Sequence, residues 1–212
     1  MTCRPCLPAE PLVRRGTVRW YEHSQTPGTA AKDDRTGSDA KKGWTMKVLV
    51  AYGSQFGSTA QIAERIATVL RQEGHDSTVA SVDEAPDPSA FGAAVVGSAV
   101  HAGHWLTGAA TFLDRHRSSL ASRPVWLFSS GPVGDRGVAA PQPDPKEVSK
   151  VRGSIGPRDH RVFAGSFDRA TADFSGLGLV ERTVVRRFLS DGDWRDWDAI
   201  EGWARGIARS LS

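Results

Sequence analysis

The segment AYGSQFGSTAQIAERIA, residues 51–67, joins an apolar run to a helical pattern through a loop of small residues. The run Val48–Tyr52 is continuously apolar, which is typical of a parallel strand covered on both faces. Ile62 and Ile66 follow at helical spacing, and Gly74 ends the apolar pattern. The segment therefore predicts a β-strand, a tight loop and an α-helix in direct succession.

The loop residues favour an anion at the start of that helix. A helix N-terminus offers unpaired N–H groups and a partial positive charge. Gly53 and Gly57 let the backbone approach closely, while Ser54, Ser58 and Thr59 add hydroxyl donors. A nucleoside triphosphate loop needs a Lys that is missing here, and the glycine spacing departs from the dinucleotide fingerprint. The pattern predicts a site for one terminal phosphate; an ordinary strand–turn–helix with a good N-cap is the alternative.

The same alternation of apolar runs and helical patterns continues along the chain. Strands are predicted at residues 48–52, 78–82, 93–98, 125–129 and 161–167. Helices are predicted after the first loop and around residues 106–113, 145–151, 177–189 and 197–211. Strands that alternate with helices predict an α/β fold, a doubly wound five-stranded parallel sheet of order 2-1-3-4-5. Ligands of such sheets bind at the carboxyl ends of the strands.

Residues 1–45 differ in composition from the rest of the chain. They are polar, rich in Gly, Ser, Thr and Lys, and lack an apolar period, which predicts a disordered extension. They hold eight of the 27 Lys/Arg and five of the 24 Asp/Glu, so residues 46–212 are formally neutral. We interpret Met46 as the biological start and residues 46–212 as one domain. Because the basic excess lies outside that domain, no nucleic-acid interface is indicated.

Hydropathy predicts a cytoplasmic protein. No apolar run reaches the roughly 18 residues of a membrane span, and no signal-peptide core is found. The segment Leu179–Leu189 combines arginines with apolar residues and predicts a weak contact with the inner membrane surface. A sheet-covering helix with a solvated face is the alternative. Cys3 and Cys6 have no second pair, and no metal site is predicted.

Two further loops fall at the same edge of the predicted sheet. GSAVHAGHW, residues 97–105, follows the second central strand, and SSGPVGDRG, residues 129–137, follows the next one. Both are rich in glycine and small residues. Three such loops at neighbouring strand ends fit a phosphate at one loop and a flat ring held between the other two.

These three loops resemble those of a flavodoxin-type FMN-binding domain. Within that family the chain most resembles the menaquinone-dependent protoporphyrinogen dehydrogenase group, through the Gly-His-aromatic step at residues 103–105 and the Asp-Trp-rich last helix, DWRDWDAIEGWARGIA, residues 193–208. The resemblance covers roughly residues 46–208 and is weak between residues 132 and 158. Ala102 replaces an aromatic residue of that group, which weakens the inference about the substrate but not about the cofactor.

The resemblance implies FMN as the cofactor and assigns residues to it. The residues implied to hold the phosphate are Ser54, Gln55, Phe56, Gly57, Ser58 and Thr59. Those implied to flank the isoalloxazine are Gly97, Ser98, Ala99, Val100, His101, Gly103, His104, Trp105, Ser129, Ser130, Gly131, Pro132, Val133 and Gly134. His104 is the candidate catalytic residue, donating a hydrogen bond or a proton to the flavin. Solvated loop histidines are the alternative, and Trp105 either stacks on the ring or starts the core of its helix.

The implied function is electron transfer by a flavin-dependent oxidoreductase, a protoporphyrinogen or quinone-linked dehydrogenase whose partner is a quinone or a redox protein. The alternative is a small flavodoxin-type carrier without a substrate of its own. Carriers of this family tend to be strongly acidic, whereas this domain is formally neutral. The charge therefore favours an enzyme.

Overall fold

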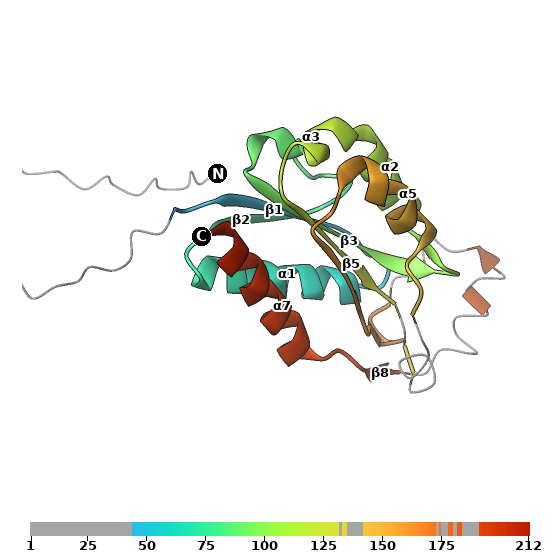
Figure 1. The fold of residues 1–212 in the computed structure, drawn as a ribbon. Helices are drawn as coiled ribbons and strands as arrows, with labels where there is room; N and C mark the ends of the chain where they lie inside the picture. Colours follow the sequence, from blue (N-terminus) through green and yellow to red (C-terminus); the bar gives the residue numbers. More distant parts are fainter. Residues whose placement is uncertain are drawn as a thin grey trace, which may run out of the picture. The chain divides into compact units, whose positions relative to one another are not determined.

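A parallel sheet of order β2-β1-β3-β5-β6 forms the centre of the protein (Figure 1). The computed structural model describes residues 44–131, 133–134, 142–172, 174, 178–179, 182–183 and 191–212. The parallel strands are β1 (Lys47–Gly53), β2 (Asp76–Ser81), β3 (Ala93–His101), β5 (Val125–Ser130) and β6 (Asp159–Phe163). The α/β class and the predicted strand order are thus confirmed. The short strand β4 (His104–Trp105), which pairs antiparallel with β3, was not expected.

Strand β1 lies inside the sheet because its side chains are apolar on both faces. Val48, Leu49, Val50 and Ala51 are all fully buried. Alternate residues face opposite sides of a strand, so a continuous apolar run serves two hydrophobic cores at once. The loop that follows β1 lies at the carboxyl edge of the sheet, between β1 and the first turn of α1.

Helices cover both faces of the sheet (Figure 1). One core contains α1 (Ser58–Gln72) and α7 (Trp197–Leu211), which pack together on one face. The other core contains side chains from α2 (Thr107–Arg115), α3 (Arg117–Ala121) and α5 (Lys146–Ile155). A short 3₁₀ helix, η1 (Pro88–Ala90), precedes β3. These two layers hold the strand ends rigidly.

The predicted strand 161–167 was wrong at its end. Strand β6 stops at Phe163, and β7 (Ser166–Phe167) belongs to a separate antiparallel pair with β8 (Gly192–Asp193). Gly165 lies at the break, where a Cβ would meet Ser58 Oγ and Ser130 Oγ at 3.5 Å each. The chain leaves the sheet there and turns over the strand ends.

Two predictions fall on segments outside the described residues. The extension at residues 1–45 is described only from Trp44 onward, and only three residues of Leu179–Leu189 are described. The disordered extension and the membrane-surface contact therefore stay predictions. Among the described residues, no helix is both long enough and apolar enough to cross a bilayer.

Candidate functional site

The loop between β1 and α1 has features that favour an anion. Its N-cap, Gly57, has a φ of +85° and no side chain caps the first turn of α1. The Gly57 amide donates to Ser54 Oγ at 3.2 Å, which closes the loop on itself. A Cβ at Gly57 would meet no heavy atom within 4 Å. The Cβ side of this N-cap is thus unobstructed, and a helix N-terminus is a favourable place for an anion.

Four loops converge on one cavity of about 110 Å³ at the carboxyl ends of the strands. The predicted residues that line it are Gln55, Phe56, Ser58, Thr59, Ala99, Val100, His101, Ser130, Gly131 and Val133. They come from all three loops that the sequence assigns to the cofactor. Pro132 lies outside the described residues.

A fourth loop, Gly165–Phe167, lines the same cavity and was missed by the sequence analysis. The Ser166 amide donates to Ser58 Oγ at 2.9 Å. This loop therefore contacts residues 54–59, the predicted phosphate loop. Phe167 packs edge-on against Phe56 with ring centroids 5.4 Å apart, and Phe174 lies 5.9 Å from Phe56. The Gly-x-Phe pattern after the last strand was the signal available in the sequence.

The second loop is a tight β-hairpin rather than an open loop. Val100 pairs with Trp105, and His101 pairs with His104, across a two-residue turn. Ala102 (φ +49°) and Gly103 (φ +79°) both have positive φ, as type I′ turns require. The tip of this hairpin is exposed, and His101, which directly precedes the turn, lines the cavity.

The candidate catalytic residue, His104, is bonded to a helix instead of lining the cavity. Its Nδ1 lies 2.9 Å from Oε1 of Glu147 in the first turn of α5. The other carboxylate oxygen accepts the Trp105 amide at 2.8 Å. Burial acts to raise the pKa of Glu147, but these hydrogen bonds outweigh it and hold that pKa below its ordinary value. The hairpin is therefore tied to α5.

Several of the residues that the sequence assigned to the cofactor site have a structural role in packing or hydrogen bonding. A Cβ at Gly97 would lie 2.1 Å from the Phe128 ring, so glycine is needed for packing. Ser98 Oγ accepts the Leu106 amide at 3.0 Å and donates to the Ala99 carbonyl. None of the predicted residues Ser54, Gly57, Gly97, Ser98, Gly103, His104, Trp105, Ser129 and Gly134 lines the described cavity.

A chain of hydrogen bonds joins Trp105 to the α5 entry. Trp105 is 4% exposed, and its indole N–H donates to Ser129 Oγ at 2.8 Å. Ser129 Oγ lies 2.8 Å from His160 Nε2, and His160 Nδ1 lies 2.8 Å from Asp144 Oδ1. Arg152 also pairs with Asp144. Four side chains from separate segments are thus linked beneath the hairpin.

The surroundings of the His160 imidazole favour its neutral form. Burial lowers its pKa below the ordinary value of 6.5 because the charged form loses hydration, and the nearby Asp144 carboxylate does not outweigh this effect. For Asp144, burial acts to raise the pKa, but the hydrogen bonds from His160 and Arg152 prevail and hold it below 3.8.

Stability is expected to fall as the pH falls below about 6.5. The unfolded chain then binds a proton at residue 160 that the folded protein excludes, since the folded pKa of His160 is lowered. Asp144 acts in the same direction near its ordinary value of 3.8. Urea midpoints between pH 7.5 and 5 measure the effect, and His160→Gln should flatten the curve. Parallel curves for the variant and the wild type would contradict this prediction.

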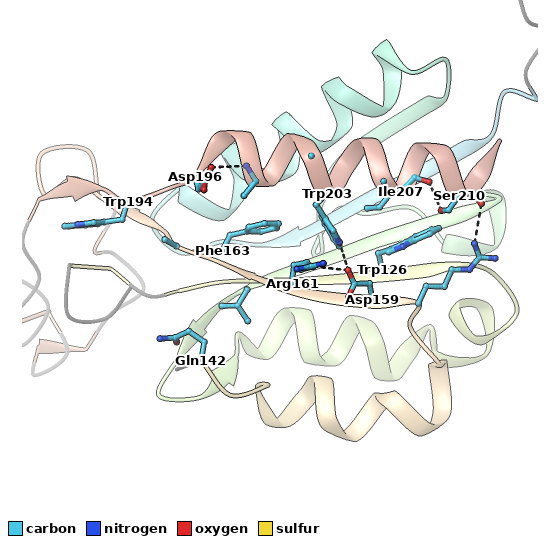
Figure 2. Close-up of a pocket in the computed structure, with 16 residues that line it drawn as sticks. Trp126, Gln142, Asp159, Arg161, Phe163, Trp194, Asp196, Trp203, Ile207 and Ser210 are labelled. Atoms are coloured by element: carbon cyan, nitrogen blue, oxygen red, sulfur yellow. Dashed lines mark hydrogen bonds and ion pairs between the residues drawn. The ribbon is translucent and has the colours of Figure 1, made fainter. Parts of the chain in front are cut away.

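A larger groove of about 780 Å³ lies between α7 and the edge strand β6 (Figure 2). In Figure 2 the Trp203 indole points to Asp159, to which it donates at 2.9 Å, and Arg161 pairs with the same carboxylate. Arg158 lies over the Trp126 ring at 5.3 Å. The phosphate loop does not reach this groove, so the smaller cavity is the candidate cofactor site.

A parallel sheet of this order, with a glycine- and serine-containing loop between β1 and α1, is typical of the class of flavodoxin-like folds. The family model described as "Flavodoxin domain" matches residues 49–192, and the chain belongs to this family. Its cofactor is accordingly FMN.

A curated relative and two solved structures carry the comparison further. Protoporphyrinogen IX dehydrogenase [quinone] from Escherichia coli K12 is 28% identical over 86 residues, 40% of this chain and 48% of the relative. The chain thus spans about half the length of the curated relatives it matches. A flavodoxin from the domain Archaea aligns at 16% identity over 78% of this chain and 99% of its own, with a TM-score of 0.54. A flavodoxin from Pseudomonas aeruginosa aligns at 18% identity over the same shares, with a TM-score of 0.51. The two structures support the fold.

The residues of the cavity fit FMN at its phosphate end. The uncapped first turn of α1, together with the buried Ser58 and Thr59, supplies the donors that a phosphate needs. The cavity of about 110 Å³ is smaller than the roughly 300–1,000 Å³ of sites for ligands of this size.

Proposed function

We propose that this protein is an FMN-dependent dehydrogenase that passes electrons from a reduced small molecule to a quinone-type acceptor, with protoporphyrinogen as the candidate donor. The carrying observation is the convergence of the phosphate loop with the ends of β3 and β5 on one cavity. The partial similarity to the quinone-linked relative supports the choice of donor and acceptor. We further propose a cytoplasmic location.

In this proposal the phosphate is bound by Ser54–Thr59, and the ring lies between Gly97–Trp105 and Ser129–Gly134. Bound FMN supplies one- or two-electron transfer. The amides of the first turn of α1 stabilise the phosphate charge. The buried strands β3 and β5 hold the two flanking loops apart at a fixed spacing.

We propose His101, in place of His104, as the histidine beside the flavin. His101 lines the cavity, whereas His104 is paired with Glu147. The two histidines are cross-strand partners on one face of the hairpin. In this position the His101 side chain can donate a hydrogen bond or a proton toward the ring.

An electron carrier without its own substrate is the second candidate. The alignment with an archaeal flavodoxin over 99% of that chain favours it. The formal neutrality of residues 46–212 favours the enzyme, because carriers of the family tend to be acidic.

Absorbance and turnover test the proposal together. Purified protein is expected to be yellow and to release FMN on denaturation. Steady-state oxidation of protoporphyrinogen with menaquinone, compared with cytochrome c reduction by the reduced protein, separates the two candidates. A colourless protein that added FMN does not stabilise would refute the cofactor site, and cytochrome reduction without porphyrinogen turnover would favour the carrier.

A further inference from the structure

The hydrogen bonds that link Trp105, Ser129, His160 and Asp144 all have their donors on the side of Trp105 and their acceptors on the side of Asp144. The Asp144 carboxylate, being ionised, only accepts, so the facing Nδ1 of His160 carries the proton. A neutral imidazole then presents Nε2 as an acceptor, and Ser129 must donate its hydroxyl proton to it. The remaining lone pairs of Ser129 Oγ receive the indole N–H of Trp105. Every donor in this chain meets one acceptor.

The order Ser129, His160, Asp144 matches that of a hydrolytic triad, but the burial of the serine excludes that role. Ser129 is fully buried, and its oxygen is occupied by the indole of Trp105. A nucleophile has to reach a substrate carbonyl. This series of hydrogen bonds therefore has a structural role, which is to hold one side chain in place.

That side chain is Trp105, which is fixed at both of its N–H groups. The indole N–H is held by Ser129, and the backbone N–H is held by Glu147. Trp105 is the second residue after the hairpin turn and pairs with Val100 at the base of the hairpin. Its position therefore determines where the base of the hairpin lies against the cavity.

Both hydrogen bonds to Trp105 depend on residues at the start of α5. Asp144 precedes the helix by two residues and acts through His160 and Ser129, while Glu147 lies in the first turn. The third loop enters α5 through this same segment. The two loops that flank the cavity are thus connected to each other by hydrogen bonds, of which the one between Trp105 and Ser129 is buried.

We propose that Asp144 and His160 are positioning residues that act through Ser129 on Trp105 and set the place of the hairpin against the flavin. This inference rests on the proposed function, in which that hairpin flanks the ring. Neither residue lines the described cavity. The groups that face His160 are Asp144, Arg152 and Asp159, so its protonation at low pH would reverse the Nε2 bond and loosen Trp105.

Two measurements on the FMN-free wild type test the chain itself. Nitrogen-15 NMR at pH 7.5 is expected to find His160 as the Nδ1–H tautomer, and the Trp105 indole proton is expected to exchange slowly. The Nε2–H tautomer or a rapidly exchanging indole would overturn the proposal, without any variant and independently of flavin binding.

The variant Asp144→Ala tests the positioning role. It removes the acceptor of His160 Nδ1–H, so we expect about tenfold faster exchange of the Trp105 indole and about tenfold weaker FMN binding. The flavin absorption band should also shift. Asp144→Asn keeps an acceptor oxygen and should restore most of the affinity, since the amide oxygen can still receive the Nδ1 proton.

Asp114→Ala is the matched control, because Asp114 also pairs with two basic side chains, Lys150 and Arg117, but forms no hydrogen bond with His160, Ser129 or the hairpin residues that the structure describes. It should change exchange and affinity less than about twofold. Equal effects of the two Ala variants, or no effect of Asp144→Ala, would overturn the positioning role. If the wild type fails to bind FMN while its tautomer is as expected, the proposed function is wrong and the flavin part of this inference falls with it.

Discussion

Gly57→Asp is expected to weaken FMN binding by about a thousandfold. Gly57 is the N-cap of α1, next to amides that no side chain caps. A carboxylate there repels a phosphate by about 4 kcal/mol per charge pair at 4 Å and an effective dielectric of 20. It also caps the free amides itself. Titration of FMN fluorescence measures the loss, which should shrink at high salt.

Two controls separate charge from backbone strain in this experiment. Gly57→Asn has nearly the same size, tolerates positive φ and carries no charge, so it should lose only about tenfold. Gly74→Asp makes the same chemical change at a φ of +94° beyond the other end of α1, where a Cβ also meets nothing within 4 Å. Its FMN affinity should match the wild type. Equal losses for the Asp and Asn variants at residue 57 would exclude a phosphate at this loop.

Phe128→Ala is expected to cost about 3–5 kcal/mol of unfolding free energy. Phe128 is fully buried in β5 between the sheet and α7, with its ring 6.3 Å from that of Trp203 and 6.4 Å from that of Phe163. Its loss leaves a cavity behind the strand that carries the third loop. Urea denaturation measures the change, and Trp44→Ala, at an 86% exposed tryptophan, should stay within about 0.5 kcal/mol.

The contact between Gly97 and Phe128 gives a second check on the same core. Gly97→Ala alone should cost about 1–3 kcal/mol, because its Cβ would lie 2.1 Å from the ring. In a Phe128→Leu background the cost should be smaller, since the ring is gone. Strict additivity of the two substitutions would mean that the strands do not pack as described here.

The fold and the strand–loop–helix succession at its start were predictable because their signals are local. The apolar run Val48–Tyr52, the glycines of the loop and the helical spacing after it are contiguous in sequence. Each of them acts through the backbone within a few residues. The alternation of five such strands with helices then restricts the sheet to very few orders, and the structure has the predicted one.

The choice between the two hairpin histidines could not be made from the sequence. His101 and His104 are three residues apart, and their places depend on a turn with Ala102 at positive φ. A residue with a Cβ rarely adopts that φ, so the sequence carries only the glycine at position 103 as a signal. Glu147, which holds His104, lies 43 residues further along the chain.

The sequence by itself determined the sheet order, the family and the place of the loop between the first strand and the first helix. Only the tertiary structure decided that Gly165–Phe167 closes the cavity and that Trp105 is held by Ser129. Ser166 and Ser58 are 108 residues apart, and His160 reaches Ser129 across 31 residues. Hydrogen bonds over such separations depend on how helices and strands pack in space, and no local pattern of residues encodes them.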